Sequence, residues 1–168
     1  MMDNAAYWVK KLGLSPHPEG GFYREVYRSS EMVKSDALAE RFTGDRNYLT
    51  SIYFLIMYGY PSHFHRIKSD EIWYFHIGKP VTLHLIDLKG NYSLRHLGDV
   101  QAGLDCFQLC VEAGTWFAAE LTEENAFSLV SCAVAPGFDF QDFEQAKAAY
   151  LKQICSGQAA LIDRLTHD

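Results

Sequence analysis

The sequence predicts an all-β protein, a sandwich or barrel of short strands, with one helix before the strands and one helix after them. Three observations support this prediction. Aromatic residues make up 14% of the chain, and aromatic side chains favour strands and line binding pockets. Short segments of strand character are separated by turn residues at even intervals, which is typical of sandwiches and barrels. Apolar residues with helical spacing occur near the two ends of the chain.

Length and composition indicate one ordinary globular unit. The chain has 168 residues, 48% hydrophobic and 21% charged, which is enough to bury a core. It contains no repeat, linker or low-complexity stretch. We therefore expect a single domain over residues 1–168, with a helix in 1–14, a β-barrel in 22–135 and a helix in 142–155.

Charge and hydropathy exclude two classes of partner. The formal charge is −6 and Lys and Arg form no run, so no nucleic-acid partner is expected. The first ten residues lack a basic region followed by an apolar core, and the longest apolar run, 52–60, is too short for a bilayer. We expect a cytoplasmic protein with no membrane partner. The four cysteines match no zinc spacing, so we expect free thiols.

The chain begins with a predicted helix. Apolar residues recur at helical spacing over Asn4–Leu14, with Asn4 suited to the N-cap and Gly13 to the C-terminal end. Two prolines and a glycine pair in 15–21 break regular structure. His17, within this break, is expected to be exposed.

The next segment, Phe22–Ser29, alternates aromatic and charged residues as a strand does. Because side chains alternate across a strand, Arg24 and Arg28 share one face while Tyr23 lies on the other. The polar segment 30–46 is expected to form a loop with a helical turn.

The clearest strand covers Asn47–Tyr58, where both faces are apolar, so a central position in a sheet is expected. A series of shorter predicted strands follows, each bounded by turn residues: Ser62–His65, Glu71–Ile77, Val81–Asp87, Tyr92–Leu97, Cys106–Val111, Trp116–Glu120 and Phe127–Ala133. After Pro136-Gly137, an apolar stripe predicts a helix over Phe143–Ile154. The tail after 156 either extends this helix or frays.

The segment 59–78 carries the residues most suited to chemistry. His63 and His65 are two apart on an extended chain, so both imidazoles are expected on one face. Glu71 opens the next predicted strand and shares its face with Trp73. If the two strands pair as a hairpin, two imidazoles and a carboxylate converge on one pocket. Such groups bind transition metals or act as a metal-free acid–base pair.

This pattern resembles the first signature of the cupin superfamily: His63-Phe64-His65 is the histidine pair, Glu71 the acid and Gly78 the closing glycine. Cupins usually place three or four residues between the second His and the Glu, whereas this chain has five. In the stretch that resembles the second signature, Phe117 stands where a third imidazole is usual. We therefore expect no cofactor, or a divalent metal held weakly by the pair and the acid.

The resemblance extends over roughly Tyr7 to Ile154 and is specific to the cupin type 5 subfamily, which has no agreed function. It is carried by five segments: HPEGGFYREVYRS (17–29), IYFLI (52–56), HRIKSDEIWYFHIG (65–78), AGTWFAAE (113–120) and CAVAPGFDFQDFE (132–144). It implies a jelly roll, or double-stranded β-helix, usually a homodimer and akin to the dTDP-sugar 3,5-epimerases.

The kinship with epimerases implies roles for individual residues. His65 is the candidate base, oriented by Glu71. The acid would be one of three tyrosines: Tyr53, Tyr74 or Tyr23. Substrate binding would involve His63 and an arginine that meets an anion, either Arg24 or Arg28. The aromatic side chains Trp73 and Trp116 would be pocket walls or core residues.

Three functions remain open at this point. The leading hypothesis is an isomerase or epimerase that acts on a sugar-like or carbonyl compound through a His/Glu acid–base pocket. The alternatives are a metal-dependent cupin similar to dioxygenases and a non-catalytic binder of a small molecule. All three require His65 and Glu71 to meet inside a closed barrel.

Overall fold

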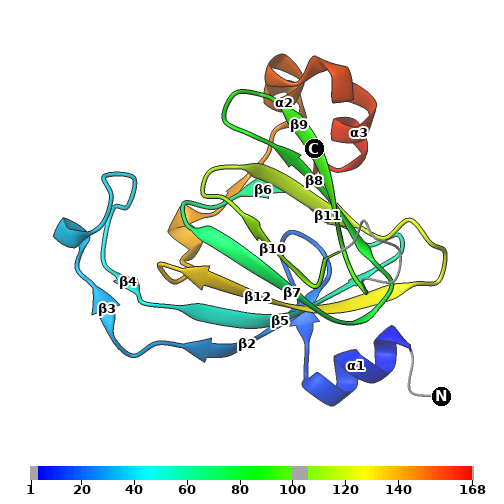
Figure 1. The fold of residues 1–168 in the computed structure, drawn as a ribbon, viewed down its shortest axis with the longest axis horizontal. Coiled ribbons are helices and arrows are strands. Elements are labelled where there is room, and N and C mark those ends of the chain that lie inside the picture. Colours follow the sequence, from blue (N-terminus) through cyan, green and yellow to red (C-terminus); the bar gives the residue numbers. More distant parts are fainter. Residues whose placement is uncertain (1–3, 100–105, 168) are drawn as a thin grey trace.

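Two antiparallel sheets face each other and enclose the core of the protein (Figure 1). The structure is a computed structural model that describes residues 4–99 and 106–167. Its strands, with short helices near both ends of the chain, confirm the predicted all-β jelly-roll fold.

The larger sheet has six strands in the order β1-β2-β5-β12-β7-β10. Their bounds are β1 Ser15–Pro16, β2 Phe22–Arg28, β5 Thr50–Met57, β12 Phe127–Ala135, β7 Asp70–Gly78 and β10 Gln108–Val111. The strand β5 lies between β2 and β12, as its two apolar faces predict. Its inward residues Ile52, Phe54 and Ile56 belong to the core between the sheets.

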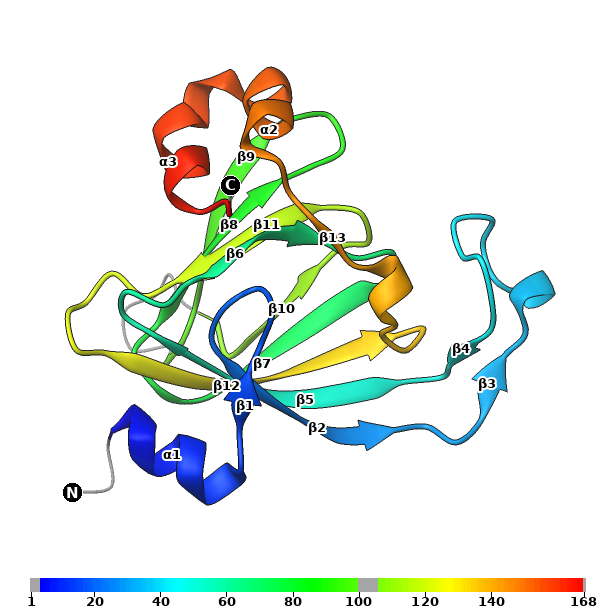
Figure 2. The same cartoon turned by 180° about the vertical axis from the view of Figure 1, so that it is seen from behind.

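The smaller sheet has five strands in the order β13-β6-β11-β8-β9. Their bounds are β13 Glu144–Gln145, β6 Ser62–Arg66, β11 Trp116–Glu120, β8 Val81–Ile86 and β9 Tyr92–Leu97. A separate ribbon of β3 (Met32–Val33) and β4 (Arg46–Asn47) extends away from the two sheets (Figure 2). Asn47, the first residue of the predicted strand 47–58, belongs to this ribbon, and the 3-10 turn Ser35–Ala37 lies between its two strands.

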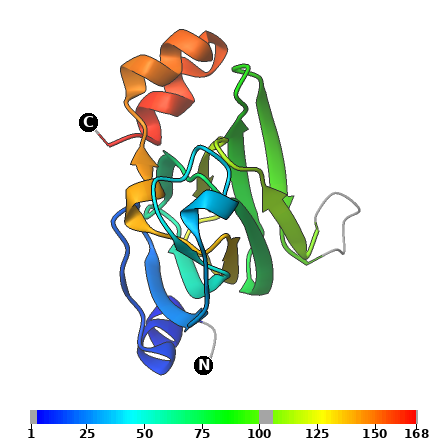
Figure 3. The ribbon, with the colours of Figure 1, turned by 90° about the vertical axis from the view of Figure 1, so that its left-hand side faces the viewer.

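Helices cover parts of the outer faces of both sheets. The helix α1 (Ala5–Leu12) is capped by Asn4, whose side chain accepts a hydrogen bond from the Tyr7 backbone N–H at 2.8 Å. It packs its apolar face on Leu55 and Leu129 of the larger sheet. The helices α2 (Ala148–Ile154) and α3 (Ala159–Arg164) lie at the opposite end of the molecule (Figure 3) and pack on the smaller sheet. No helix of the described residues is long and apolar enough to span a bilayer.

The C-terminal helix begins later than the sequence predicts. Helical spacing starts at 142–143, but Glu144–Gln145 pairs with β6 as strand β13, so α2 begins only at Ala148. A backbone that pairs with a sheet edge cannot also form helical hydrogen bonds. The chain then turns at Cys155, and the tail forms the separate helix α3.

A buried ion pair ties the base of the ribbon to the segment after β12. The Arg46 guanidinium donates from Nε to Asp142 Oδ2 and from Nη2 to Asp142 Oδ1, each at 2.6 Å. Both side chains are almost fully buried, and the remaining Nη1 donates to the backbone carbonyls of Gly44 and Asp45. This pair fixes Asp142, in the segment whose residues Phe138 and Phe140 line the internal cavity.

We predict that Asp142→Ala lowers the free energy of unfolding by about 3 kcal/mol, because it leaves the Arg46 charge buried without its partner. Urea denaturation measures this. The control Glu123→Ala removes an exposed partner of Lys79 and should change stability by no more than about 0.5 kcal/mol. Equal effects of the two substitutions would contradict the assigned role of the buried pair.

Candidate functional site

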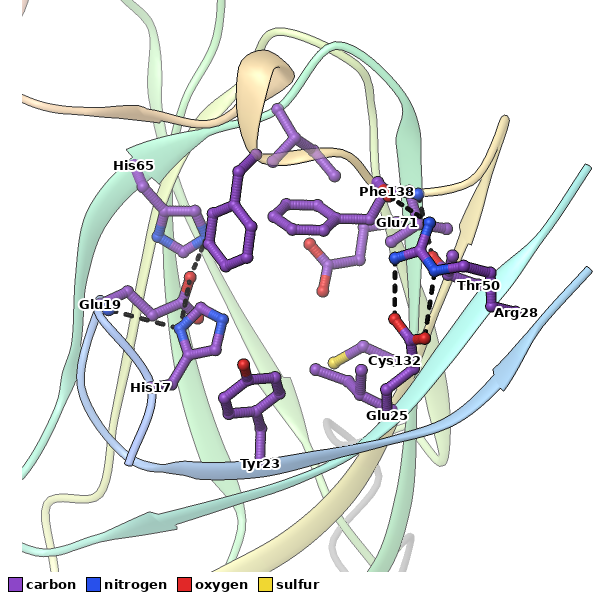
Figure 4. A pocket seen from close by; sticks show the side chains of 14 residues that line it. His17, Glu19, Tyr23, Glu25, Arg28, Thr50, His65, Glu71, Cys132 and Phe138 are labelled. Carbon is purple, nitrogen blue, oxygen red and sulfur yellow. Dashed lines mark hydrogen bonds and ion pairs between the residues drawn. The ribbon is translucent and has the colours of Figure 1, made fainter. Parts of the chain in front are cut away.

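A cavity of about 130 Å³ lies between the two sheets, with polar groups on facing walls (Figure 4). The larger sheet contributes side chains from β2, β5, β12 and β7, and the smaller sheet contributes His65 from β6. The segment after β12 covers one side. The polar lining residues are His17, Glu19, Tyr23, Glu25, Arg28, Thr50, His65, Glu71 and Cys132; the apolar ones are Ile52, Ile67, Val134, Phe138 and Phe140.

The turn between β1 and β2 carries Glu19 into this cavity. Gly20 has φ +111°, and a Cβ there would lie 2.0 Å from the Pro61 carbonyl oxygen, so only glycine permits this close approach. The Glu19 carbonyl accepts a hydrogen bond from the His63 backbone N–H at 2.8 Å. The turn is thereby held against the start of β6, and the Glu19 side chain is buried.

Glu19 is the direct partner of His65. Its Oε2 lies 3.1 Å from His65 Nε2, and its Oε1 accepts a hydrogen bond from Ser62 Oγ at 3.0 Å. His65 Nδ1 lies 2.7 Å from the His63 carbonyl oxygen. A carbonyl only accepts hydrogen bonds, so Nδ1 carries a proton. When the ring is neutral, Nε2 is therefore the unprotonated nitrogen, and it is the one that lies beside Glu19 Oε2.

His17 joins the same group from the other side. Its Nδ1 lies 3.4 Å from Glu19 Oε2 and accepts the Glu19 backbone N–H at 3.3 Å. The sequence expectation that His17 is exposed is wrong for its side chain, which is only 7% exposed. The ring packs edge-on against Tyr23, with centroids 4.5 Å apart.

Burial favours the uncharged forms of these three side chains. Desolvation raises the pKa of Glu19 and is opposed less strongly by the charge of His17 and the Ser62 hydrogen bond. Desolvation also lowers the pKa of His65 and of His17. The shifts of Glu19 and His65 point in the directions expected for a neutral acid beside a neutral imidazole.

Glu71 faces the cavity from the larger sheet. Desolvation, followed by repulsion from Glu19, raises its pKa to about 7; His65, the Cys132 thiol and the Trp73 indole lower it by less. Burial and Glu71 together raise the pKa of Cys132 well above its usual value, so this thiol is not an activated nucleophile. Glu71 is therefore able to give or take a proton near neutral pH.

A β-bulge in β2 brings Arg28 to the cavity. The pairing of β2 with β5 shifts between Glu25 and Tyr27, and such a bulge re-aims the following side chains. Strict alternation would place Arg28 with Arg24 on the outer face, but the shift places it on the same side as Tyr23 and Glu25. Its guanidinium forms a two-point ion pair with Glu25, from Nε at 3.1 Å and from Nη2 at 2.8 Å.

The structure brings together only some of the residues singled out from the sequence. His65, Glu71, Tyr23 and Arg28 line the cavity, and Trp73 lies in the core beside Glu71. The expected hairpin is wrong: β6 and β7 belong to opposite sheets, so His65 and Glu71 face each other across the barrel. The residue that orients His65 is accordingly Glu19.

His63 does not share the cavity with His65. The pairing of β6 with β11 is irregular between the partners of Ser62 and His65, so the two histidines are not on one face. The His63 ring packs against the His167 ring, with centroids 3.6 Å apart and the planes tilted by 35°, and its Nδ1 lies 2.9 Å from the Glu19 carbonyl oxygen. The expected set of His63, His65 and Glu71 as metal ligands is therefore not assembled.

Four other candidates lie outside the cavity. Tyr53 and Arg24 contact each other on the outer face of the larger sheet, with the guanidinium 5.9 Å from the ring centroid. Tyr74 alternates with Trp73 on β7 and does not line the cavity. Trp116 packs with the C-terminal helices under the Arg66 guanidinium. The sequence pattern correctly placed these four residues in strands. It does not indicate which face of a strand points into the barrel.

The residues do not fit the usual metal site of this fold. Phe117 pairs with His65 in register and lies 4.1 Å from it between ring centroids, in the place expected for a third imidazole. Among the described residues, no three His, Cys, Asp or Glu side chains are grouped so that they could hold a metal ion.

Comparison with known proteins supports the resemblance found in the sequence. Residues 6–146 match the family model described as "Cupin superfamily (DUF985)". The search of curated proteins gave no match.

Three solved structures with similar folds differ in how much sequence they share with this chain. A hypothetical protein from Leishmania major is 34% identical with a TM-score of 0.88, covering 99% of this chain and 100% of its own. A protein from Shewanella oneidensis is 37% identical with a TM-score of 0.87, covering 99% of both chains. Oxalate decarboxylase from Bacillus subtilis is 16% identical with a TM-score of 0.54, covering 89% of this chain and 36% of its own. This last similarity shows the fold alone.

The raised pKa of Glu71 has a consequence for stability. The folded protein retains a proton on Glu71 up to about pH 7, whereas an unfolded Glu loses it near 4.5. The free energy of unfolding therefore falls by about 3 kcal/mol in all as the pH rises through this window, and it levels off above the window.

We predict that Glu71→Gln removes this loss. From about pH 5 to about pH 8, the difference in free energy of unfolding between the variant and the parent protein should shift by about 3 kcal/mol in favour of the variant. Urea denaturation at both pH values measures this difference. A stability difference that stays the same at both pH values would show that Glu71 titrates normally.

Proposed function

Because this chain belongs to the family described as "Cupin superfamily (DUF985)", we propose that its barrel binds a small carbonyl compound. The barrel transfers protons to and from this compound, as an isomerase or epimerase does. The observation that carries the proposal is the arrangement of acid–base groups on facing walls. His65, whose Nε2 lies 3.1 Å from the Glu19 carboxyl, faces the cavity from one sheet, and Glu71, with a pKa of about 7, faces it from the other.

This arrangement suits removal and return of a proton at a carbon next to a carbonyl. The acid–base group on one wall, either Glu71 or His65 with Glu19, takes the proton from one side of the carbon. The group on the other wall returns a proton from the opposite side, which inverts the configuration of the carbon. Tyr23 directs its hydroxyl into the cavity (Figure 4) and is the donor best placed for the carbonyl oxygen. General acid–base groups of this kind contribute about 10²- to 10⁴-fold to a rate.

Cavity size restricts the substrate. Pockets for drug-sized ligands are about 300–1,000 Å³, whereas this cavity is about 130 Å³. A compound of a few carbon atoms fits this space better than a nucleotide sugar does. We therefore propose a short carbonyl compound in place of the larger sugar nucleotides used by the epimerases to which the family's fold is akin.

We predict that the protein accelerates exchange of carbon-bound protons with solvent deuterium. Proton NMR in deuterium oxide would follow four probes: dihydroxyacetone, glyceraldehyde, pyruvate and 2-oxobutyrate. At least one should exchange faster than in buffer. His65→Ala and Glu71→Gln should each lower that rate by about 100-fold or more.

The matched control is His76→Ala, because His76 bonds Ser131 outside the cavity lining; this variant should keep the full rate. Exchange at the buffer rate for every probe, or equal rates in parent and cavity variants, would rule out the proposal. A probe that raises the melting temperature without exchanging would favour a non-catalytic binder.

We also propose a homodimer. Beyond Tyr23 the outer edge of β2 has no neighbouring strand among the described residues, and the exposed side chains Val26 and Tyr27 lie on it. An open edge of this kind can pair with a second chain. Sedimentation at micromolar concentration should give twice the mass of one chain. Val26→Asp should shift the protein toward the monomer. A monomeric parent protein would contradict the proposal.

A further inference from the structure

The Arg28 guanidinium occupies one end of the cavity, with four of its five N–H donors directed at defined partners. Nε and Nη2 form the two-point pair with Glu25, while Nη1 donates to Asn47 Oδ1 at 2.8 Å and to the Phe138 carbonyl oxygen at 3.0 Å (Figure 4). A planar guanidinium with a carboxylate on its fork is the preferred geometry for recognising carboxylates. The site is therefore already shaped to hold one carboxylate group.

The rest of the cavity would accept a single negative charge poorly without Arg28. Arg28 carries the only permanent positive charge among the lining residues, which include three glutamates. Two of these, Glu19 and Glu71, are buried and favoured in their uncharged forms. Glu25 is the third, and it neutralises Arg28 directly. An anionic ligand that enters must therefore replace the negative charge of Glu25.

Exchange of Glu25 for a ligand has a small cost. The side chains of Arg28 and Glu25 are 37% and 41% exposed, and exposed ion pairs contribute only about 0–1 kcal/mol. Glu25 can turn its carboxylate to solvent, where it is well hydrated. Arg28 stays in place because Asn47 and the Phe138 carbonyl hold its other amino group.

The same contacts connect Arg28 to the segment that covers the cavity. The Phe138 carbonyl accepts from Arg28, and the Phe138 backbone N–H donates to Thr50 Oγ1 at 2.9 Å. Phe138 and Phe140 both line the cavity, and their rings pack edge-on at 5.1 Å. A ligand bound on Arg28 would thus lie under this aromatic cover, at the end of the cavity away from the histidines.

We propose that Arg28 binds the carboxylate of a short oxo acid in the place that Glu25 now occupies. This rests on the proposed function, because it assigns a substrate class to the same cavity: the carboxylate on Arg28, and the carbonyl carbon chain between Glu71 and His65. Glu25 serves as an internal substitute that keeps Arg28 paired until the ligand arrives.

Isothermal titration tests this with three probes: pyruvate, its uncharged counterpart pyruvamide, and inorganic phosphate. Pyruvate should bind, and pyruvamide should bind at least about tenfold more weakly. Arg28→Gln should weaken pyruvate binding by about tenfold or more, and Glu25→Gln should tighten it by about threefold to tenfold, since the competing charge is removed. Arg24→Gln, on the same strand but outside the cavity, is the matched control and should bind as the parent does.

The outcomes separate this inference from the proposed function. His65→Ala should lose proton exchange but still bind pyruvate, because Arg28 is intact. If no probe exchanges in the parent protein while pyruvate binding still depends on Arg28, the carboxylate site stands and the catalytic proposal falls. Equal affinity for pyruvate and pyruvamide, unchanged binding in Arg28→Gln, or binding of phosphate but not of pyruvate would each overturn the carboxylate site.

Discussion

The burial of four ionisable side chains inside one barrel is the constraint on which the rest of the account depends. Glu19 lies within ion-pair distance of both His65 and His17 on one side, and Glu71 faces them from the other sheet. An isolated buried charge is costly, so the fold shifts each group toward its neutral form or supplies a partner. The same cost raises the pKa of Glu71 to about 7, and this couples the stability of the barrel to its proposed chemistry.

Departures from regular backbone geometry place these groups. Gly20 lets the β1–β2 turn approach Pro61 closely enough to bury Glu19. The bulge in β2 turns Arg28 inward, and the irregular pairing of β6 separates His63 from His65. Bulges are frequent beside functional sites because they re-aim a side chain at little cost to the sheet. Here they determine which residues of two charged, aromatic strands reach the cavity.

The strands and the fold class were predictable because alternation and turn residues are local signals. So was the importance of His65 and Glu71, through the resemblance that their segment carries. Arg28 on the cavity side and His63 outside it were not predictable, since a one-residue shift in pairing reverses the face and leaves no trace in the alternation. His17 and Glu19 were missed because a turn rich in Pro and Gly indicates exposure; their place in the HPEGG segment was the available signal. The late start of α2 depends on the pairing of β13 with β6, a contact between distant segments.

The central claim is that burial holds Glu71 half-protonated near neutral pH opposite the His65–Glu19 pair. Carbon-13 NMR of the side-chain carboxyl carbons of glutamate, recorded between about pH 4 and pH 9, measures this directly. The account predicts one signal that titrates at about 7, that is absent in Glu71→Gln and that persists in Glu25→Gln. If the signal assigned to Glu71 instead titrated near 4.5, the carboxyl would be a solvated surface group, and the acid–base site proposed for this barrel would be contradicted.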